Sequence, residues 1–213
     1  MRPIFGYGSL LYDRPPGFEP GIPAWLDGYR RTLNKRSDGR GCPQHSAALP
    51  QGLDGWQSPT LRYGLAMGLV PDATRTFAQA FPLSQHPSAT PDDLLRAIDR
   101  REGWVPGSPP GACAYVREPC TLHTDRGPLP AWVYATPAAC SMIYDLDDAT
   151  IARILAHATP RVPNPHAQGI DYALRAAQAL HHLGHPDPWL DAIVDRALHL
   201  LPPDARDRTP KHP

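Results

Sequence analysis

Two short segments of the chain hold the residues whose types and spacing could do chemistry. Near the N-terminus, the apolar pair Ile4 and Phe5 is followed by Gly-Tyr-Gly-Ser at residues 6–9. Glycine permits positive φ or a close backbone approach that a Cβ atom would prevent, and successive N–H groups in such a turn can converge on an anion. Ser9 adds a hydroxyl. The segment could therefore hold a carboxylate or an acyl oxygen, and the alternative is an ordinary tight turn around a packed tyrosine.

The spacing of these glycines does not match the phosphate-binding motifs. The GxxxxGK[ST] pattern and its lysine are missing, and a dinucleotide fingerprint would need glycine where Leu11 stands. A nucleotide site is therefore not predicted here.

The second segment is Asp-Arg-Arg-Glu at residues 99–102, followed by Gly103 and Trp104. A glutamate at the end of a helix meets the negative end of the helix dipole, and a neighbouring aromatic ring shields it from water. Both effects favour the protonated form of Glu102, whereas the adjacent arginines favour the ionised form. Such a carboxylate suits general acid/base catalysis near neutral pH, and the alternative is a solvated glutamate in a run of charges.

The elements that must position these segments are short strands in the first two thirds of the chain. Apolar or alternating runs bounded by glycine and proline predict strands at Pro3–Tyr7, Gly21–Arg31, Leu61–Val70, Ala112–Leu122 and Ala131–Ala135. One helix interrupts them, because Thr90 is a capping residue, Pro91 suits the first helical position and Gly103 suits the end. The pattern favours a small barrel or a strongly bent sheet.

The last third of the sequence has helical periodicity. Helices are predicted at Asp147–His157, Asp171–Leu183 and Pro188–Leu201. With no repeat and no clear linker, residues 1–201 are expected to form a single domain, and the polar, proline-rich residues 202–213 a disordered tail. The expected fold class is α+β: a bent-sheet or β-barrel core with one inserted helix and a C-terminal helical segment.

Composition excludes several classes of function. The chain of 213 residues has 21 basic and 21 acidic side chains, so neither nucleic acid nor an anionic membrane is an expected partner. No apolar run reaches the length of a transmembrane helix, and the N-terminus lacks a signal-peptide core.

The cysteines and histidines suggest neither disulfides nor a metal site. Cys42, Cys113, Cys120 and Cys140 show no CxxC spacing, and the ten histidines form no HExxH motif. We expect four free thiols, a cytoplasmic location and no bound metal. The sequence gives no indication of oligomeric state.

Taken together, four segments resemble the γ-glutamylcyclotransferase superfamily, and its ChaC-type, glutathione-degrading branch in particular. They are FGYGSL at 5–10, WLDGYRRTLNKRSDGRGCP at 25–43, IDRREGW at 98–104 and AQGIDYAL at 167–174. They occur in the family's order and span about residues 3–183. The resemblance implies a γ-glutamylcyclotransferase-like fold and the cyclisation of a γ-glutamyl group to 5-oxoproline, with release of an amine or of Cys-Gly.

The resemblance also implies roles for individual residues. No metal or organic cofactor is required, and the partner is a small γ-glutamyl substrate. Glu102 is the expected catalytic acid/base. The expected substrate-binding residues are Tyr7, Gly8, Ser9 and Leu10, through their backbone N–H groups, and Arg40 and Tyr172.

The chain departs from the family pattern at three motif positions. Tyr12 replaces the usual Trp, Gly39 replaces the histidine of HRG, and Gly169 replaces an Asn. Residues 73–91 match no family motif. Two alternatives to glutathione cyclisation therefore stay open: the same reaction on another γ-glutamyl amine or metabolite, and a non-catalytic binding protein of this fold.

Overall fold

The computed structural model describes residues 1–37, 42–43, 64–84, 89–109, 112–113, 115–137, 140, 145–159 and 169–201. The chain forms two compact units. The first comprises Met1–Thr32 and Met67–Ile143, and the second comprises Leu33–Ala66 and Tyr144–Pro213. That residues 1–201 form one domain stays a prediction. No helix among the described residues is both long enough and apolar enough to cross a membrane.

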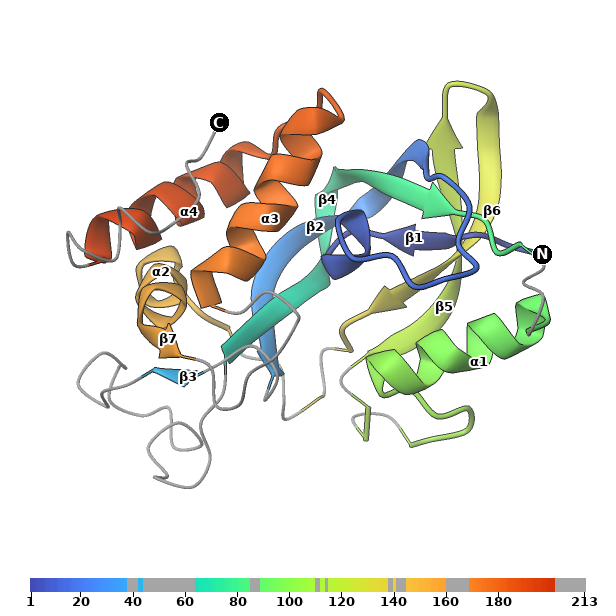
Figure 1. Cartoon of the computed structure of the whole chain (residues 1–213), viewed down its shortest axis with the longest axis horizontal. Coiled ribbons are helices and arrows are strands. Elements are labelled where there is room, and N and C mark those ends of the chain that lie inside the picture. The colour runs from blue at the N-terminus through green and yellow to red at the C-terminus, as the bar shows by residue number, and fades with distance from the viewer. Residues whose placement is uncertain are drawn as a thin grey trace. The chain divides into compact units, whose positions relative to one another are not determined.

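Five strands form a closed barrel in the order β1-β4-β2-β5-β6 (Figure 1). They are β1 (Ile4–Gly6), β2 (Ile22–Ser37), β4 (Gly64–Phe81), β5 (Val116–Thr124) and β6 (Gly127–Ala135). The short strand β1 closes the barrel, because it pairs antiparallel with β4, Ile4 opposite Phe81, and parallel with β6. The predicted barrel core is confirmed, and the fold class is α+β.

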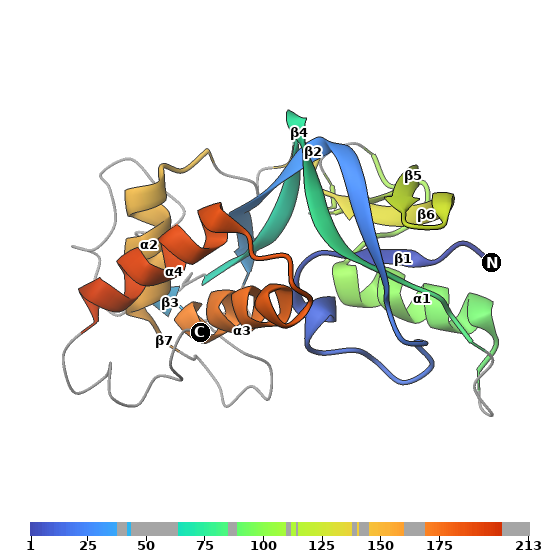
Figure 2. The same ribbon diagram turned by 90° about the horizontal axis from the view of Figure 1, so that it is seen from above.

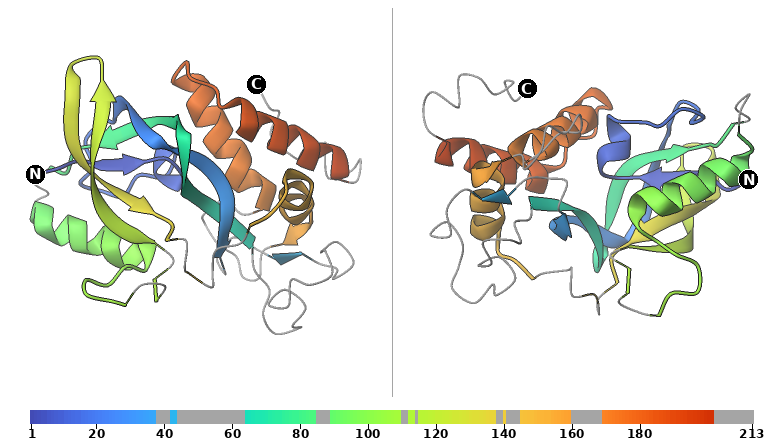
Figure 3. Two further views of the ribbon diagram at one scale, coloured as in Figure 1. Left: turned by 180° about the vertical axis from the view of Figure 1, so that it is seen from behind. Right: turned by 60° about the horizontal axis from the view of Figure 1, so that its bottom comes forward.

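The strands β5 and β6 form a hairpin whose register fixes which of their residues lie opposite each other (Figure 3). Gly127 has φ of 106° in its turn, a conformation that favours glycine. The antiparallel pairing places Arg117 directly opposite Tyr134. In an antiparallel pair, directly opposed residues point to the same face of the sheet.

The predicted inserted helix is confirmed as α1 (Pro91–Glu102), which lies alongside the barrel (Figure 1). Its N-terminus has a capping box, in which Thr90 Oγ1 accepts from the Asp93 N–H and the Asp93 carboxylate accepts from the Thr90 N–H. Gly103 ends it in the left-handed conformation, with φ of 71°.

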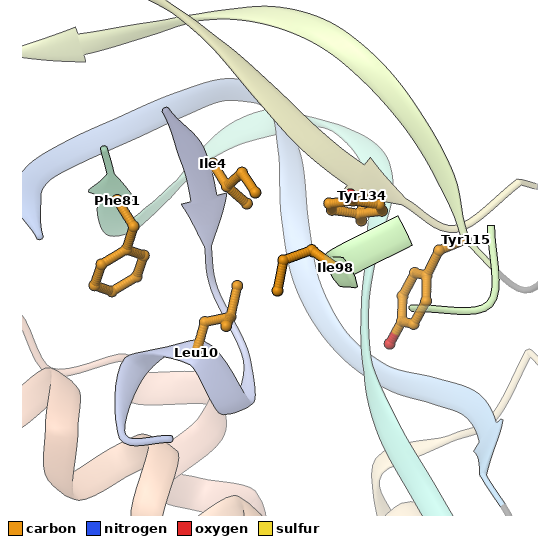
Figure 4. Close-up of a cluster of buried hydrophobic side chains, with 6 residues drawn as sticks. All are labelled: Ile4, Leu10, Phe81, Ile98, Tyr115 and Tyr134. Atoms are coloured by element: carbon orange, nitrogen blue, oxygen red, sulfur yellow. The ribbon is translucent and has the colours of Figure 1, made fainter. Parts of the chain in front are cut away.

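Side chains from the barrel, α1 and the N-terminal loop form one hydrophobic cluster (Figure 4). Its members are Ile4, Leu10, Phe81, Ile98, Tyr115 and Tyr134, all buried. The hydroxyl of Tyr115 donates to the Met67 carbonyl. The cluster joins the end of β1 and the loop after it to the helix that carries Glu102, so apolar burial fixes the frame of the candidate site.

The second unit is mainly helical (Figure 2). Its helices are α2 (Asp148–His157), α3 (Gly169–His182) and α4 (Pro188–Leu200), and a two-stranded sheet pairs β3 (Cys42–Pro43) with β7 (Ala158–Thr159). All three predicted helices are confirmed. The Trp189 indole N–H donates to Asp148 across α4 and α2.

The predictions of β2 and β4 were too short. We expected short strands, whereas β2 has 16 residues and β4 has 18. The expected end of the third strand at Val70 was wrong, because β4 continues through Pro71 to Phe81. In its second half, buried Thr76, Ala78 and Ala80 alternate with more exposed neighbours.

Candidate active site

The segment Gly-Tyr-Gly-Ser joins β1 to a short 3-10 helix, η1 (Ser9–Leu11). Carbonyl groups at its start accept the later N–H groups: Gly8 O accepts from Leu11, and Ser9 O accepts from Tyr12 and Asp13. The N–H groups of Ser9 and Leu10 have no acceptor among the described residues, as is usual for the first turn of a helix. The predicted strand and loop are confirmed. These two adjacent backbone N–H groups are candidate donors to a substrate.

Glycine is required at position 6 for close packing and not for positive φ, which was one of the two reasons we expected. Neither Gly6 nor Gly8 has positive φ. A Cβ atom on Gly6 would lie 2.6 Å from Phe81 Cε2 and 2.7 Å from Leu10 Cβ. Gly6 therefore allows the chain to pack closely against its own core.

Tyr7 and Arg31 hold the loop in place. The Tyr7 side chain is buried, and its hydroxyl donates to the carbonyl of Tyr134 at 2.5 Å. The guanidinium of Arg31, with only 4% of its surface exposed, donates through Nε to Tyr7 O at 3.1 Å and through Nη2 to Phe77 O at 2.6 Å. Hydrogen bonds from a buried guanidinium are strong and directional, so they fix the positions of the carbonyl groups that accept them. The tyrosine is thus packed, as the alternative interpretation expected.

Arg101 connects the loop to the end of α1. Its Nη2 donates to Ser9 Oγ at 3.0 Å, its Nη1 donates to the Asp13 carbonyl at 3.3 Å, and it pairs with the Asp13 carboxylate at 3.4 Å. Its Nε lies 3.7 Å from Glu102 Oε1. A single guanidinium thus contacts both segments that the sequence singled out.

Glu102 is the last residue of α1, and 19% of its side chain is exposed. It is neither fully solvated nor locked away from ligands. Arg101 balances part of its charge, and Gly103 turns the chain away directly behind it. A carboxylate in such a place can exchange a proton with a bound ligand.

One turn earlier on α1, the carboxylate of Asp99 is buried and fully engaged. Its Oδ2 accepts from Arg117 Nη1 at 3.0 Å, and its Oδ1 accepts from the Tyr134 hydroxyl at 2.6 Å. The exposed fractions of the Asp99 and Arg117 side chains are only 8% and 15%. Arg117 and Tyr134, which are directly opposite each other in the hairpin, therefore each bind one oxygen of the Asp99 carboxylate.

Two tryptophans enclose the guanidinium of Arg117. Its Cζ lies 4.4 Å from the ring centre of Trp104 and 4.9 Å from that of Trp132. Such cation–π contacts strengthen as water is removed. The Asp99–Arg117 pair is thus shielded from solvent on the side of the rings.

The Tyr134 hydroxyl remains protonated in this setting. Burial, the hydrogen bond to Asp99 and the negative charges of Asp99 and Glu102 together raise the pKa of Tyr134 far above its usual value, against the opposing effect of Arg117. Tyr134 is therefore a neutral donor to Asp99 at any working pH, and it lies within electrostatic reach of Glu102.

The structure places the remaining predicted residues less directly. Arg40 lies outside the described residues. Tyr172 belongs to the second unit, on α3, with 2% of its surface exposed. Gly8 and Ser9 are partly exposed, whereas Leu10 contributes its side chain to the core.

Sequence reasoning gave no site role to Arg31, Arg117 and Tyr134. Asp99 lies in the segment that the sequence singles out, and with Glu118 it is the next carboxylate to test if Glu102 is not the catalytic group. No comparable local signal pointed to the other three.

A family model described as ChaC-like protein matches residues 2–199. The chain belongs to this ChaC-like family. The family resemblance expected from the sequence is thereby confirmed over nearly the whole chain.

Solved structures show the same fold. The selenomethionine-labelled yeast γ-glutamylcyclotransferase specific to glutathione aligns with a TM-score of 0.69 at 15% identity, over 93% of this ChaC-like chain and 96% of the yeast chain. A second structure of the yeast enzyme gives 0.60 and 17%, over 91% and 96%. No curated protein sequence is significantly similar to the chain.

Proposed function

We propose that this ChaC-like protein is a γ-glutamylcyclotransferase, a lyase that converts glutathione to 5-oxoproline and Cys-Gly. One observation carries the proposal: Arg101 joins Ser9 of the glycine loop to the helix end that bears Glu102. This brings backbone donors and a carboxylate together within one unit of a ChaC-like chain. The yeast protein of the same fold, whose structure is described as specific to glutathione, supports the choice of substrate.

The reaction needs one proton acceptor that later becomes a donor. The α-amine of the γ-glutamyl group attacks its own γ-carbonyl carbon, a five-membered ring closes, and the amide bond to the leaving nitrogen breaks. An α-ammonium group with a pKa of about 8 must first lose a proton. Glu102 accepts that proton and passes one to the departing nitrogen. Because the nucleophile is intramolecular, the main task of the protein is to fold the substrate into an attacking conformation.

The glycine loop supplies the stabilisation of charge. The backbone N–H groups of Ser9 and Leu10 would donate to the oxyanion that forms on the γ-carbonyl, each contributing about 3 kcal/mol. Tyr7 and Gly8 line the same turn. Arg40 remains our candidate for the α-carboxylate of the substrate, and Tyr172 a candidate for orienting it.

A different γ-glutamyl amine is the second candidate substrate. Three departures favour it: Tyr12, Gly39 and Gly169. Gly169, which begins α3 with φ of 51°, brings no side chain where the family has the amide of an Asn. The chemistry at the carbonyl is unchanged, so only the leaving amine differs.

A panel of substrates tests the proposal. The protein is incubated with glutathione, γ-glutamyl dipeptides and γ-glutamyl amines, and 5-oxoproline is quantified by mass spectrometry. Release from glutathione supports the first candidate, and release from another compound alone supports the second. If no compound yields 5-oxoproline although γ-glutamyl ligands bind, the protein is a non-catalytic binder. A cytoplasmic location, tested by fractionation, is part of the proposal.

A further inference from the structure

We propose that Asp99 is a positioning residue for Glu102: its buried carboxylate, held by Arg117 and Tyr134, fixes the last turn of α1 against the hairpin β5–β6. This inference rests on the proposed function, in which Glu102 moves the proton. It assigns the second carboxylate of the turn a role that differs from acid/base catalysis.

The hydrogen bonds of Asp99 leave it no free oxygen for chemistry. Oδ2 accepts from Arg117 and Oδ1 accepts from Tyr134, at 3.0 and 2.6 Å. Both donors come from directly opposed positions of one hairpin, so their spacing is fixed by the strand register. A carboxylate offers two equivalent acceptors to such a pair, which an amide cannot.

The backbone of Asp99 reinforces the same turn. Its carbonyl accepts from the Trp104 N–H at 2.8 Å, and the Gly103 N–H is shared between the carbonyls of Asp99 and Arg100. Trp104 in turn stacks on Arg117, which holds the carboxylate. Asp99 therefore ties both ends of the segment 99–104 to the barrel, and Glu102 lies within that segment.

Asp99 is close enough to Glu102 along α1 for its anchoring to affect the position of Glu102. Residues three apart on a helix occupy neighbouring places on its surface, and the Tyr134 hydroxyl that donates to Asp99 feels the charge of Glu102. Arg101, two residues after Asp99, donates to Ser9 in the loop that carries the backbone donors. A shift of about 1 Å in such an arrangement can cost about a hundredfold in rate.

A matched pair of substitutions on one helix tests the role. Asp99→Asn leaves one oxygen for two donors, and Asp93→Asn makes the same chemical change at the exposed capping box, far along α1. We expect Asp99→Asn to lower kcat by about 10- to 100-fold with KM changed less than about twofold. Hydrogen exchange should rise at residues 99–104. Asp93→Asn should raise exchange at residues 90–95 and leave kcat within about twofold of wild type.

Each result decides the proposal. A wild-type kcat in folded Asp99→Asn, or an equal loss of kcat in the two variants, would overturn it. If Asp99→Asn does not fold, Tyr134→Phe removes one hydrogen bond without changing charge, and an unaltered kcat there would also overturn it. If the wild-type protein forms no 5-oxoproline, the proposed function fails separately. Exchange at residues 99–104 in Asp99→Asn then decides, and unchanged exchange refutes the positioning role.

Discussion

Asp99 and Glu102 are carboxylates of one helical turn with different surroundings. Asp99 is buried and accepts two hydrogen bonds, whereas Glu102 is partly exposed beside Arg101. Two hydrogen bonds to a buried carboxylate fix its position, whereas partial exposure lets a carboxylate meet a ligand. The surroundings of the two carboxylates, and not their chemical type, are therefore the basis for proposing an anchoring role for Asp99 and proton transfer for Glu102.

Replacing Glu102 by Gln should abolish turnover and leave binding largely intact. Gln keeps the shape of the side chain but can neither accept the ammonium proton nor return one, and loss of a general acid/base typically costs about 10²–10⁴ in rate. The loss should reach the upper end, because one group serves both transfers. The measurement is 5-oxoproline release, with ligand binding by calorimetry. Glu118→Gln, on β5, is the control, and near-normal turnover of Glu102→Gln would show that Glu102 is not the catalytic group.

The Cys120 thiol should react slowly with alkylating reagents. Burial raises its pKa to about 11, against the opposing charge of Arg2. At pH 8.5 about half of an ordinary thiol is thiolate, but well under 1% of Cys120 would be. Modification by iodoacetamide should be at least about 50-fold slower than for free cysteine at pH 8.5 and should accelerate as the pH rises through 10. A rate equal to that of free cysteine would contradict this, and denatured protein is the control.

At the scale of elements, the end of α1 and the loop after β1 depend on each other through Arg101. Arg101→Ala removes the hydrogen bonds to Ser9 and to the Asp13 carbonyl. We expect kcat/KM to fall about 10- to 100-fold, because the loop loses its fixed position relative to Glu102. Guanidinium at low millimolar concentration should restore part of the activity.

Arg100 provides the matched control for that experiment. It is exposed on the same turn and carries the same charge. Arg100→Ala should retain the kinetics of wild type within about twofold. Equal effects of the two substitutions would mean that charge near the helix end matters and that the contacts of Arg101 do not.

The capping box of α1 makes a separable contribution to stability. Thr90→Ala removes the side-chain acceptor of the Asp93 N–H and should lower the free energy of unfolding by about 1 kcal/mol. Urea denaturation measures it, and Thr90→Ser, which retains the hydroxyl, should stay within a few tenths of a kcal/mol of wild type. If the alanine variant is as stable as wild type, the cap is not formed in solution.

The elements differ in how well the sequence predicted them. The ends of α1 were predicted closely because Thr90, Pro91 and Gly103 are local signals. The second half of β4 was missed because Pro71 suggested a break, although the alternation of Thr76, Ala78 and Ala80 was a strand signal.

The candidate site was predictable only in part. The glycine loop and Glu102 stand out as motifs in the sequence. Arg117 and Tyr134 do not stand out. They share Asp99 as a partner only because the register of the hairpin places them opposite each other and α1 packs on that hairpin. Register depends on contacts made across the fold.

At the scale of the whole molecule, the fold persists while most residues change. The yeast structure aligns over 93% of this chain at 15% identity. Shared architecture at that distance does not by itself fix the reaction. The reaction must therefore be tested at the few groups that meet at the end of α1, and the choice of substrate with the panel of γ-glutamyl compounds.

Removing residues 202–213 should leave stability and activity unchanged. Their composition is polar and rich in proline, which predicts a tail without a packed core. The thermal midpoint of a chain ending at Leu201 should lie within about 1 °C of the full chain. A larger decrease would show that the segment packs on the rest of the protein.

The closure of the barrel by β1 has a consequence for biosynthesis. The hydrogen bond from Tyr7 to Tyr134 joins residues 127 positions apart, and that from Arg101 to Ser9 spans 92. Contacts so distant in sequence form late and slow the folding of a domain. On the ribosome the first strand emerges long before β6, its parallel neighbour. β4 can pair with β1 earlier, but Ile4 and Phe5 reach their full native burial only once the hairpin is made, which prolongs the time in which apolar surface of the nascent chain can aggregate.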